Sequence, residues 1–314
     1  MVGTGMDDVT TWLLDGDPAI RWQVMRDLLA EPESVWKAEQ YRVADEGWGA
    51  QLLSHQDDEG RWTRKLYGYK WISTTYSIVL LRRMGLPAGD PRADRTCRLF
   101  LDEALWPDGG INISVSLERS EECVTGMVLA LYAWFGIGDP RGERLVDYLL
   151  AEQMPDGGWN CDRFRGAVHS SFHTTINVLE GFREYAIAGG PRADEAAAAE
   201  ERGREFLLEH QLYRSHRTGD VVDDRMMRLS FPPRWRHDGL RALDYFRSAN
   251  APTDERLAGA IDVLVAKQRR DGRWPLQQRY PGRTWFEMEQ VGQPSRWNTL
   301  RALRVLNWWR GNRP

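Results

Sequence analysis

Residues 145–159 read LVDYLLAEQMPDGGW, and after a loop the chain continues at residues 172–179 with FHTTINVL. The first stretch is an apolar helical run that ends in Asp-Gly-Gly. This is a helix stop, because glycine readily adopts the left-handed conformation that closes a last turn. The same succession of run, stop, loop and new helix recurs about every fifty residues. Such a period predicts repeated helical hairpins, none of which can bury its apolar face alone.

Six helix openings mark this repeat. Taking one marker residue from each, the steps between markers are 51, 50, 50, 64 and 60 residues; the markers are Val24, Thr75, Thr125, Thr175, Gly239 and Thr299. Apolar residues at helical spacing predict helices over 18–30, 34–55, 73–85, 92–105, 122–136, 141–153, 171–188, 193–211, 236–249, 253–268 and 295–310, with a short opening helix near 7–14. Strand signals are close to absent, so the expected fold class is all-α.

Composition excludes several classes of protein. The 314 residues include 42 basic and 46 acidic residues, for a net charge of −4, which lacks the basic footprint of a nucleic-acid binder. Three cysteines without paired spacing argue against a disulfide framework. Residues 1–10 hold no basic region followed by an apolar run, so we expect no signal peptide, and no segment approaches the roughly 18 apolar residues of a membrane span. We expect a soluble cytoplasmic protein with no integral membrane span and no nucleic-acid partner; its oligomeric state is not indicated.

A glutamine followed by Gly-x-Trp recurs at the end of the outer helices. The phrase stands at Gln56 with Gly60-Arg61-Trp62, Gln153 with Gly157-Gly158-Trp159, and Gln268 with Gly272-Arg273-Trp274. It resembles the QW repeat of squalene-hopene cyclases and oxidosqualene cyclases, and protein prenyltransferase β subunits are similar in fold. The resemblance implies an (α/α)6 toroid, a ring of six helical hairpins around a central cavity. In that family the repeat is structural, because the glutamine ties neighbouring outer helices together.

The resemblance also implies how the chain is organised. We expect one toroid domain over residues 1–314, with the long irregular segment 212–235 as a candidate lid or, alternatively, a surface insertion. The cyclases have two toroidal domains and protonate an alkene with an Asp-x-Asp-Asp string at an inner-helix start. This chain has the length of one such domain and lacks the string, since Asp220-Val221-Val222-Asp223-Asp224 has one spacer too many.

The first turns of inner helices should point toward one end of the cavity. The candidate ligand-binding residues there are Trp22, Trp71, Glu122, Cys123, Phe172, Trp235, Trp297 and Asn298. Polar residues at helix starts also cap free backbone N–H groups, which is the preferred interpretation for Asn298. Five arginines in and after the long segment suit a diphosphate or else balance nearby aspartates; they are Arg225, Arg228, Arg234, Arg236 and Arg241.

Asp238, His237 and His173 are the candidate catalytic residues. A carboxylic acid in an apolar aromatic pocket beside a histidine can have its proton affinity tuned for general-acid work, and the competing roles are a helix cap or an ion pair. His169 and His173, four residues apart, offer a zinc alternative with Cys123 or Cys161. No position matches the prenyltransferase zinc site, so we predict no metal and no cofactor.

Three functions are compatible with these residues. The leading hypothesis is a terpene-cyclase-like enzyme that acts on a small apolar, isoprenoid-type substrate in the central cavity by acid-initiated carbocation chemistry, because aromatic faces stabilise cations. The second is a non-catalytic toroid that binds an isoprenoid-like ligand or a partner peptide. The third is a carbohydrate-active (α/α)6 enzyme, for which Asp238 and Glu122 are the obvious carboxylates.

Overall fold

The chain folds into a ring of helices. The computed structural model describes residues 4–114 and 116–311, so the ends of the predicted 1–314 domain lie outside the described residues. Within those ranges the chain forms helices, turns and isolated β-bridges but no strand, and none of the described helices is long and apolar enough to cross a membrane.

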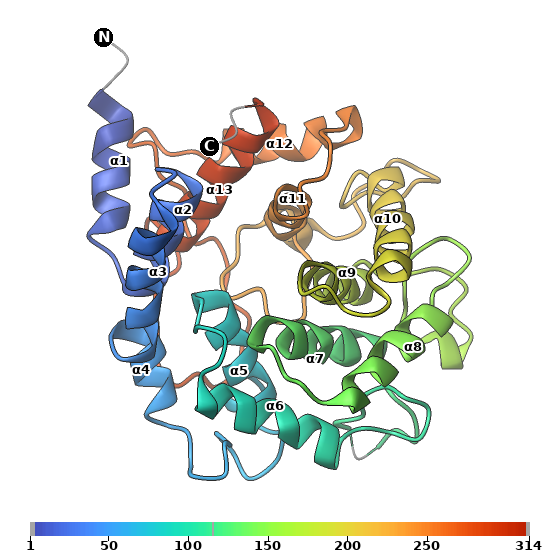
Figure 1. The fold of residues 1–314 in the computed structure, drawn as a ribbon. Helices are drawn as coiled ribbons and strands as arrows, with labels where there is room; N and C mark the ends of the chain where they lie inside the picture. Colours follow the sequence, from blue (N-terminus) through green and yellow to red (C-terminus); the bar gives the residue numbers. More distant parts are fainter. Residues whose placement is uncertain (1–3, 115, 312–314) are drawn as a thin grey trace.

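Two layers of helices build the ring (Figure 1). Those nearest the centre are α2 (Pro18–Asp27), α5 (Thr74–Met84), α7 (Glu122–Phe135), α9 (Phe172–Ile187), α11 (Gly239–Ser248) and α13 (Arg296–Trp309). Those outside them are α1 (Thr4–Leu14), α3 (Glu33–Tyr41), α4 (Gly47–Leu53), α6 (Pro91–Glu103), α8 (Glu143–Ala151), α10 (Ala193–Glu209) and α12 (Ala258–Ala266). The expected all-α, (α/α)6 toroid is confirmed.

The tryptophan of the recurring phrase explains the period of the sequence. The indole N–H of Trp159 donates to the carbonyl oxygen of Leu149 in α8 at 2.7 Å, and its backbone N–H donates to the hydroxyl of Thr175 in α9 at 3.1 Å. A buried indole needs such a partner, so each tryptophan ties an outer helix to the next inner helix. The corresponding contacts elsewhere are those of Trp62 with Leu52 and Thr74, and of Trp274 with Leu264 and Thr299.

The glutamine of the phrase links successive outer helices. The side-chain amide of Gln153 donates to the carbonyl oxygens of Gly157, at 2.7 Å, and of Ala199 in α10, at 2.8 Å. Gln56 donates to the hydroxyl of Thr96 in α6 at 2.7 Å. Gly157 has a φ of +91°, and a Cβ there would lie 2.5 Å from an α10 carbonyl oxygen, so only glycine fits. The expected tie between neighbouring outer helices is therefore present at Gln56 and Gln153.

The ring closes where α13 meets α2. The Nη1 of Arg304 donates to the side-chain oxygen of Gln23 and to Asp27, both at 2.9 Å, across more than 270 residues of sequence. At the other end of α13, the Nε of Arg296 donates to the carbonyl oxygen of Trp12 in α1 at 3.0 Å. The last inner helix therefore holds both the first inner helix and the first outer helix.

Helices α7 and α9 pack extensively against each other. A Cβ added at Gly126 would lie 2.7 Å from the Cα of Val178, and one added at Gly181 would lie 2.6 Å from the carbonyl oxygen of Gly126. Two backbones can approach this closely only where neither residue carries a side chain. The two glycines therefore set the spacing of the inner ring on this side.

The single helix predicted over residues 34–55 is wrong. It is divided into α3, a 3-10 turn at Arg42–Ala44, and α4. Gly47 opens α4 with a φ of +62°, and any Cβ there would collide with the carboxylate of Asp17. That carboxylate accepts a hydrogen bond from the backbone N–H of Trp48 at 2.7 Å. The chain breaks here because Asp17 caps a new helix.

Much of the segment 212–235 packs into the ring. Leu212 and Tyr213 are buried, a 3-10 helix covers Asp224–Met227, and residues 229–233 are buried again. Its role as a lid stays a prediction. A second long irregular segment, 267–295, was not singled out from the sequence; it runs beside α5, where the indole N–H of Trp285 donates to the hydroxyl of Ser77 at 3.3 Å.

Candidate functional site

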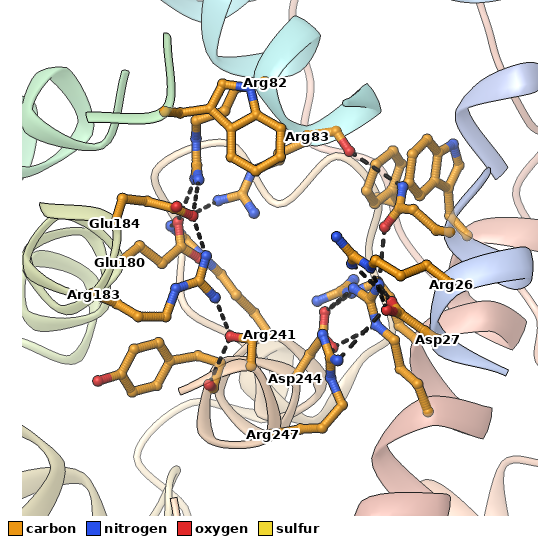
Figure 2. A pocket seen from close by; sticks show the side chains of 18 of the residues that line it. Arg26, Asp27, Arg82, Arg83, Glu180, Arg183, Glu184, Arg241, Asp244 and Arg247 are labelled. Carbon is orange, nitrogen blue, oxygen red and sulfur yellow. Dashed lines mark hydrogen bonds and ion pairs between the residues drawn. The ribbon is translucent and has the colours of Figure 1, made fainter. Parts of the chain in front are cut away.

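The centre of the ring holds an open cavity of about 410 Å³. All six inner helices contribute to its walls, mostly through their middle and C-terminal turns. The uncharged lining residues are Trp22, Gln23, Trp134, Ile187, Phe231, Tyr245, Ser248 and Trp297, and the charged ones are Arg26, Asp27, Arg82, Arg83, Glu180, Arg183, Glu184, Arg241, Asp244, Arg247, Arg301 and Arg304. Figure 2 shows the charged side chains on opposite sides of an open centre.

One set of charges, the α9 group, is formed by Glu180 and Glu184 of α9 with Arg82, Arg83, Arg183 and Arg241. Arg241 holds Glu180 with two parallel bonds, Nε to Oε1 at 2.8 Å and Nη2 to Oε2 at 2.9 Å. Arg83 donates to the same carboxylate at 2.8 Å, and Arg82 donates to Glu184 at 2.9 Å. Burial opposes ionisation, but the guanidinium groups of Arg241 and Arg83 hold the pKa of Glu180 well below its ordinary value.

The other set, the Asp27 group, is formed by Asp27 and Asp244 with Arg26, Arg247, Arg301 and Arg304. Arg304 donates to Asp27 at 2.9 Å and to Asp244 at 2.6 Å, which joins α13 to both α2 and α11. Burial again opposes ionisation, but Arg26 and Arg304 lower the pKa of Asp27 to about 2, and Arg304 and Arg247 lower that of Asp244. Both carboxylates are therefore charged at neutral pH.

Positive charge exceeds negative charge in this cavity. Eight arginines and four carboxylates line it, with no lysine or histidine, which gives a net charge of +4. Burial and the surrounding guanidinium groups lower the pKa of Arg83 to about 9, although Glu180 opposes the shift. The Nε atoms of Arg83 and Arg183 are buried and have no hydrogen-bond acceptor among the described residues. Figure 2 shows Arg83 directed into the open centre. The carboxylates thus leave part of the guanidinium surface uncompensated.

Five aromatic side chains complete the lining, namely Trp22, Trp134, Phe231, Tyr245 and Trp297. The rings of Phe231 and Trp297 stack with their centroids 4.0 Å apart. The indole N–H of Trp22 donates to the carbonyl oxygen of Met84, the last residue of α5, at 2.8 Å. The indole N–H of Trp134 donates to the carbonyl oxygen of Leu86, just after α5, at 2.9 Å. The buried indole nitrogen of Trp297 has no acceptor among the described residues. The cavity therefore combines a charged part with apolar ring faces.

The sequence analysis expected eleven site residues, of which the structure places Trp22 and Trp297 in the lining of this cavity. The nine that do not line it are Trp71, Glu122, Cys123, Phe172, His173, Trp235, His237, Asp238 and Asn298. The difference has a simple cause: the cavity draws on later turns of the inner helices, whereas most of the nine stand at or just before a first turn. Their binding and catalytic roles stay predictions.

The candidate histidines do lie together. The backbone N–H of His237 donates to the Nδ1 of His173 at 2.9 Å, and the Nε2 of His237 lies 2.6 Å from the carbonyl oxygen of Leu212. Burial lowers the pKa of His173 to about 3 and that of His237 to about 4. Both rings are therefore neutral at pH 7 and hold the backbone between α9 and α11.

Asp238 has the capping role that was weighed against catalysis. Its carboxylate is fully buried and accepts from the backbone N–H of Arg241 at 2.8 Å, which caps α11. It also accepts from the hydroxyl of Ser230 at 2.5 Å. Ser230 precedes Phe231 of the cavity lining, so Asp238 lies one layer of residues behind the cavity wall.

Glu122 and Cys123 form a separate cluster at the start of α7. Arg119 donates to one Glu122 oxygen at 3.2 Å, the other is buried without a partner among the described residues, and burial raises the Glu122 pKa. The backbone N–H of Cys123 donates to the sulfur of Cys161 at 3.3 Å. The zinc alternative is not assembled, because no three His, Cys, Asp or Glu side chains of the described ranges are placed to hold a metal.

Three further expectations are corrected. Asn298 does not cap α13, because the hydroxyl of Ser295 accepts from the backbone N–H of Asn298. The five arginines around segment 212–235 do not form one patch, since only Arg241 reaches the cavity, while Arg225 pairs with Asp223 at the surface. Asp238 and Glu122 do not share the cavity, so the carboxylate pair of the carbohydrate-active hypothesis is absent from it.

The sequence analysis missed every charged lining residue except Arg241. Most of the charged lining residues stand 2, 5 or 8 positions after a marker, as Arg241, Asp244 and Arg247 do after Gly239. This spacing puts them on one face of each inner helix. A charged stripe of that kind is normally a solvated helix face. The recurrence of charged residues at equivalent positions of several inner helices was the feature of the sequence that could have identified them.

No protein-family model matches the chain, and no curated protein matches it. Among solved structures, a protein from Actinoplanes is similar at 18% identity and a TM-score of 0.48, covering 97% of this chain and 98% of that one. A variant of the type II terpene cyclase MstE from Scytonema, in complex with geranylgeranyl dihydroxybenzoate, is similar at 17% identity and a TM-score of 0.46, covering 96% and 95%. We infer the chemistry of the cavity from the side chains that line it and not from these structures.

Proposed function

We propose that the protein binds a small isoprenoid-type ligand in the central cavity of its helical ring, as a terpene-cyclase-like protein would. The observation that carries this proposal is the cavity itself: an opening of about 410 Å³ that is lined in part by Trp22, Trp134, Phe231 and Trp297. The volume lies in the range of about 300–1,000 Å³ that is usual for small-molecule sites, and the aromatic residues supply the apolar part of a lining in which 12 of 20 residues are charged. Phe231 and Trp297, stacked at 4.0 Å, offer a preformed apolar surface.

The cavity wall supports binding better than acid-initiated turnover. An acid that protonates an alkene has to carry a proton at working pH. The cavity carboxylates are bound to arginines, and the pKa values of Asp27, Glu180 and Asp244 are lowered by them. We therefore place binding first and turnover second.

Turnover remains the second candidate because of Asp238. This buried carboxylate stands at the start of an inner helix and contacts Ser230, next to the lining residue Phe231. Protonation of a substrate by Asp238 would require the Ser230–Phe231 segment to move aside. Incubation with farnesol, geranylgeraniol and squalene, followed by product analysis, tests this candidate. Product that persists in the Asp238→Asn variant, or no product from the wild type, would remove it.

Tryptophan fluorescence tests the binding proposal, because three tryptophans line the cavity. Farnesol and geranylgeraniol should quench the emission with saturation. Trp134→Ala should weaken the affinity about tenfold, since an aromatic contact of this area contributes roughly 1.5 kcal/mol. Trp106→Ala is the matched control, because Trp106 is exposed and does not line the cavity. Equal affinity of the two variants, or no saturable quenching, would contradict the proposal.

A further inference from the structure

The two charged sets in the cavity have the same composition. The α9 group and the Asp27 group each hold four arginines and two carboxylates, and they face each other across the open centre (Figure 2). Each set therefore carries an excess of two positive charges. An equal excess on both sides of a gap suits an anion placed between them.

The excess of positive charge in the cavity destabilises the ligand-free protein. Guanidinium groups taken out of water need acceptors, and the Nε atoms of Arg83 and Arg183 have none among the described residues. The pKa of Arg83 falls to about 9, mainly through burial. Helix C-termini favour cations in the last turns, where Arg82, Arg83 and Arg247 stand, but the helix carbonyls are not acceptors for the orphaned Nε groups. A bound anion in the cavity would offset this excess of positive charge.

The chemistry of the cavity selects the kind of anion. The paired N–H groups of a guanidinium match two oxygens of a phosphate. Several guanidinium groups around one space therefore match an anion whose oxygens point in several directions. A single carboxylate has two oxygens and could serve only one side. Nucleic acid is disfavoured because the cavity is enclosed by the ring and the whole chain carries a net charge of −4.

We propose that the central cavity holds a phosphate or diphosphate group between the α9 group and the Asp27 group, contacted by Arg83 and Arg183 on one side and by Arg247 and Arg301 on the other. This inference rests on the proposed function, which places a ligand in the same cavity, and it adds the polar end of that ligand. The apolar end lies against Trp22, Trp134, Phe231 or Trp297. Asp27, Asp244, Glu180 and Glu184 stay paired with arginine, so guanidinium N–H groups make the contacts to phosphate.

Isothermal titration calorimetry of the full chain with sodium diphosphate tests the proposal. The buffer contains EDTA, because the site as proposed uses arginine rather than a metal ion. We expect saturable binding that weakens as salt rises, since the contacts are ionic and the cavity is open. Absence of saturable diphosphate binding would overturn the proposal.

Variants locate the site. Arg83→Gln and Arg183→Gln should each weaken diphosphate binding at least tenfold, because each removes a charge-assisted contact. Arg165→Gln is the matched control, since Arg165 is exposed and pairs with Asp162 away from the cavity. Far-ultraviolet circular dichroism confirms that each variant is folded. Folded Arg83→Gln and Arg183→Gln proteins that bind diphosphate as the wild type does would overturn the assignment.

Two further probes separate this inference from the proposed function. Farnesol carries the apolar chain alone, and farnesyl diphosphate carries both parts. Tighter binding of farnesyl diphosphate than of either part supports both statements. Diphosphate binding to which the farnesyl chain adds nothing upholds the phosphate site and refutes the isoprenoid-type ligand. Farnesol binding that is not improved by the diphosphate upholds the proposed function and refutes the phosphate site.

Discussion

Replacing Arg83 by glutamine should stabilise the ligand-free protein, although Arg83 forms an ion pair. Its pKa is lowered from the ordinary value to about 9, so keeping it protonated at pH 7 costs the fold on the order of 5 kcal/mol. That cost is already net of the 2.8 Å contact to Glu180, which as a charge-assisted bond is worth about 2 kcal/mol. Water in the open cavity reduces both quantities. We therefore expect a net gain of about 1 kcal/mol in the free energy of unfolding.

The neighbouring residue provides the control. Arg82 donates to both Glu180 and Glu184, and Arg82→Gln removes both contacts. Glu180 keeps Arg83 and Arg241, and Glu184 keeps Arg183, so neither carboxylate is left bare. The expected loss is about 1 to 2 kcal/mol. Two arginine-to-glutamine changes at adjacent positions should thus have opposite signs.

Urea unfolding followed by circular dichroism measures both variants, and an unchanged m-value shows that the same surface is exposed on unfolding. Adding sodium diphosphate should then stabilise the wild type by mass action and have much less effect on Arg83→Gln. A loss of more than 1 kcal/mol in ligand-free Arg83→Gln would refute the reasoning. It would mean that Arg83 is a net stabilising partner of Glu180 and that the cavity carries no effective excess of charge.

Three further predictions concern the fold. The pKa of Asp27, lowered from 3.8 to about 2, should contribute about 2 kcal/mol of stability above pH 4 that is lost as the pH falls toward 2; urea unfolding across this range should show the loss in the wild type and not in Asp27→Asn. Gly126→Ala should cost about 2 kcal/mol, because its Cβ would lie 2.7 Å from the α9 backbone, whereas Gly138→Ala, with open space around it, should be nearly neutral in thermal unfolding. Asp238→Ala should cost about 1 to 2 kcal/mol through loss of the α11 cap, and Asp238→Asn much less, because an asparagine oxygen can still accept from the backbone; equal losses would contradict the capping role.

The architecture was predictable because helix stops and helix starts recur at regular intervals along the sequence. The marker at Thr175 and the tryptophan at Trp159 bond to each other, so their regular spacing reflects one unit of structure. Local departures from the repeat were not predictable from the spacing of the motifs. The break at Gly47 depends on Asp17, thirty residues away, whose carboxylate caps the new helix.

The site was predicted less well, for a physical reason. Helix starts attract polar residues for capping, and Asp238 shows how easily a cap resembles a reactive group. The arginines of the cavity looked like an ordinary solvated face, because a helix pattern does not say whether that face meets bulk water or the inside of a closed ring. Of the eleven expected site residues only Trp22 and Trp297 line the cavity, and of the five arginines suited to a diphosphate only Arg241 does.

The contact of Arg304 with Gln23 and Asp27 has a consequence for biosynthesis. Arg301, Arg304 and Trp297 all belong to α13, the last helix of the described chain. A growing polypeptide thus carries most of the cavity's guanidinium groups long before the wall that completes the cavity has been made. If the earlier repeats fold before α13 emerges from the ribosome, we expect them to form an open arc whose concave face carries six of the eight cavity arginines and is accessible to polyanions.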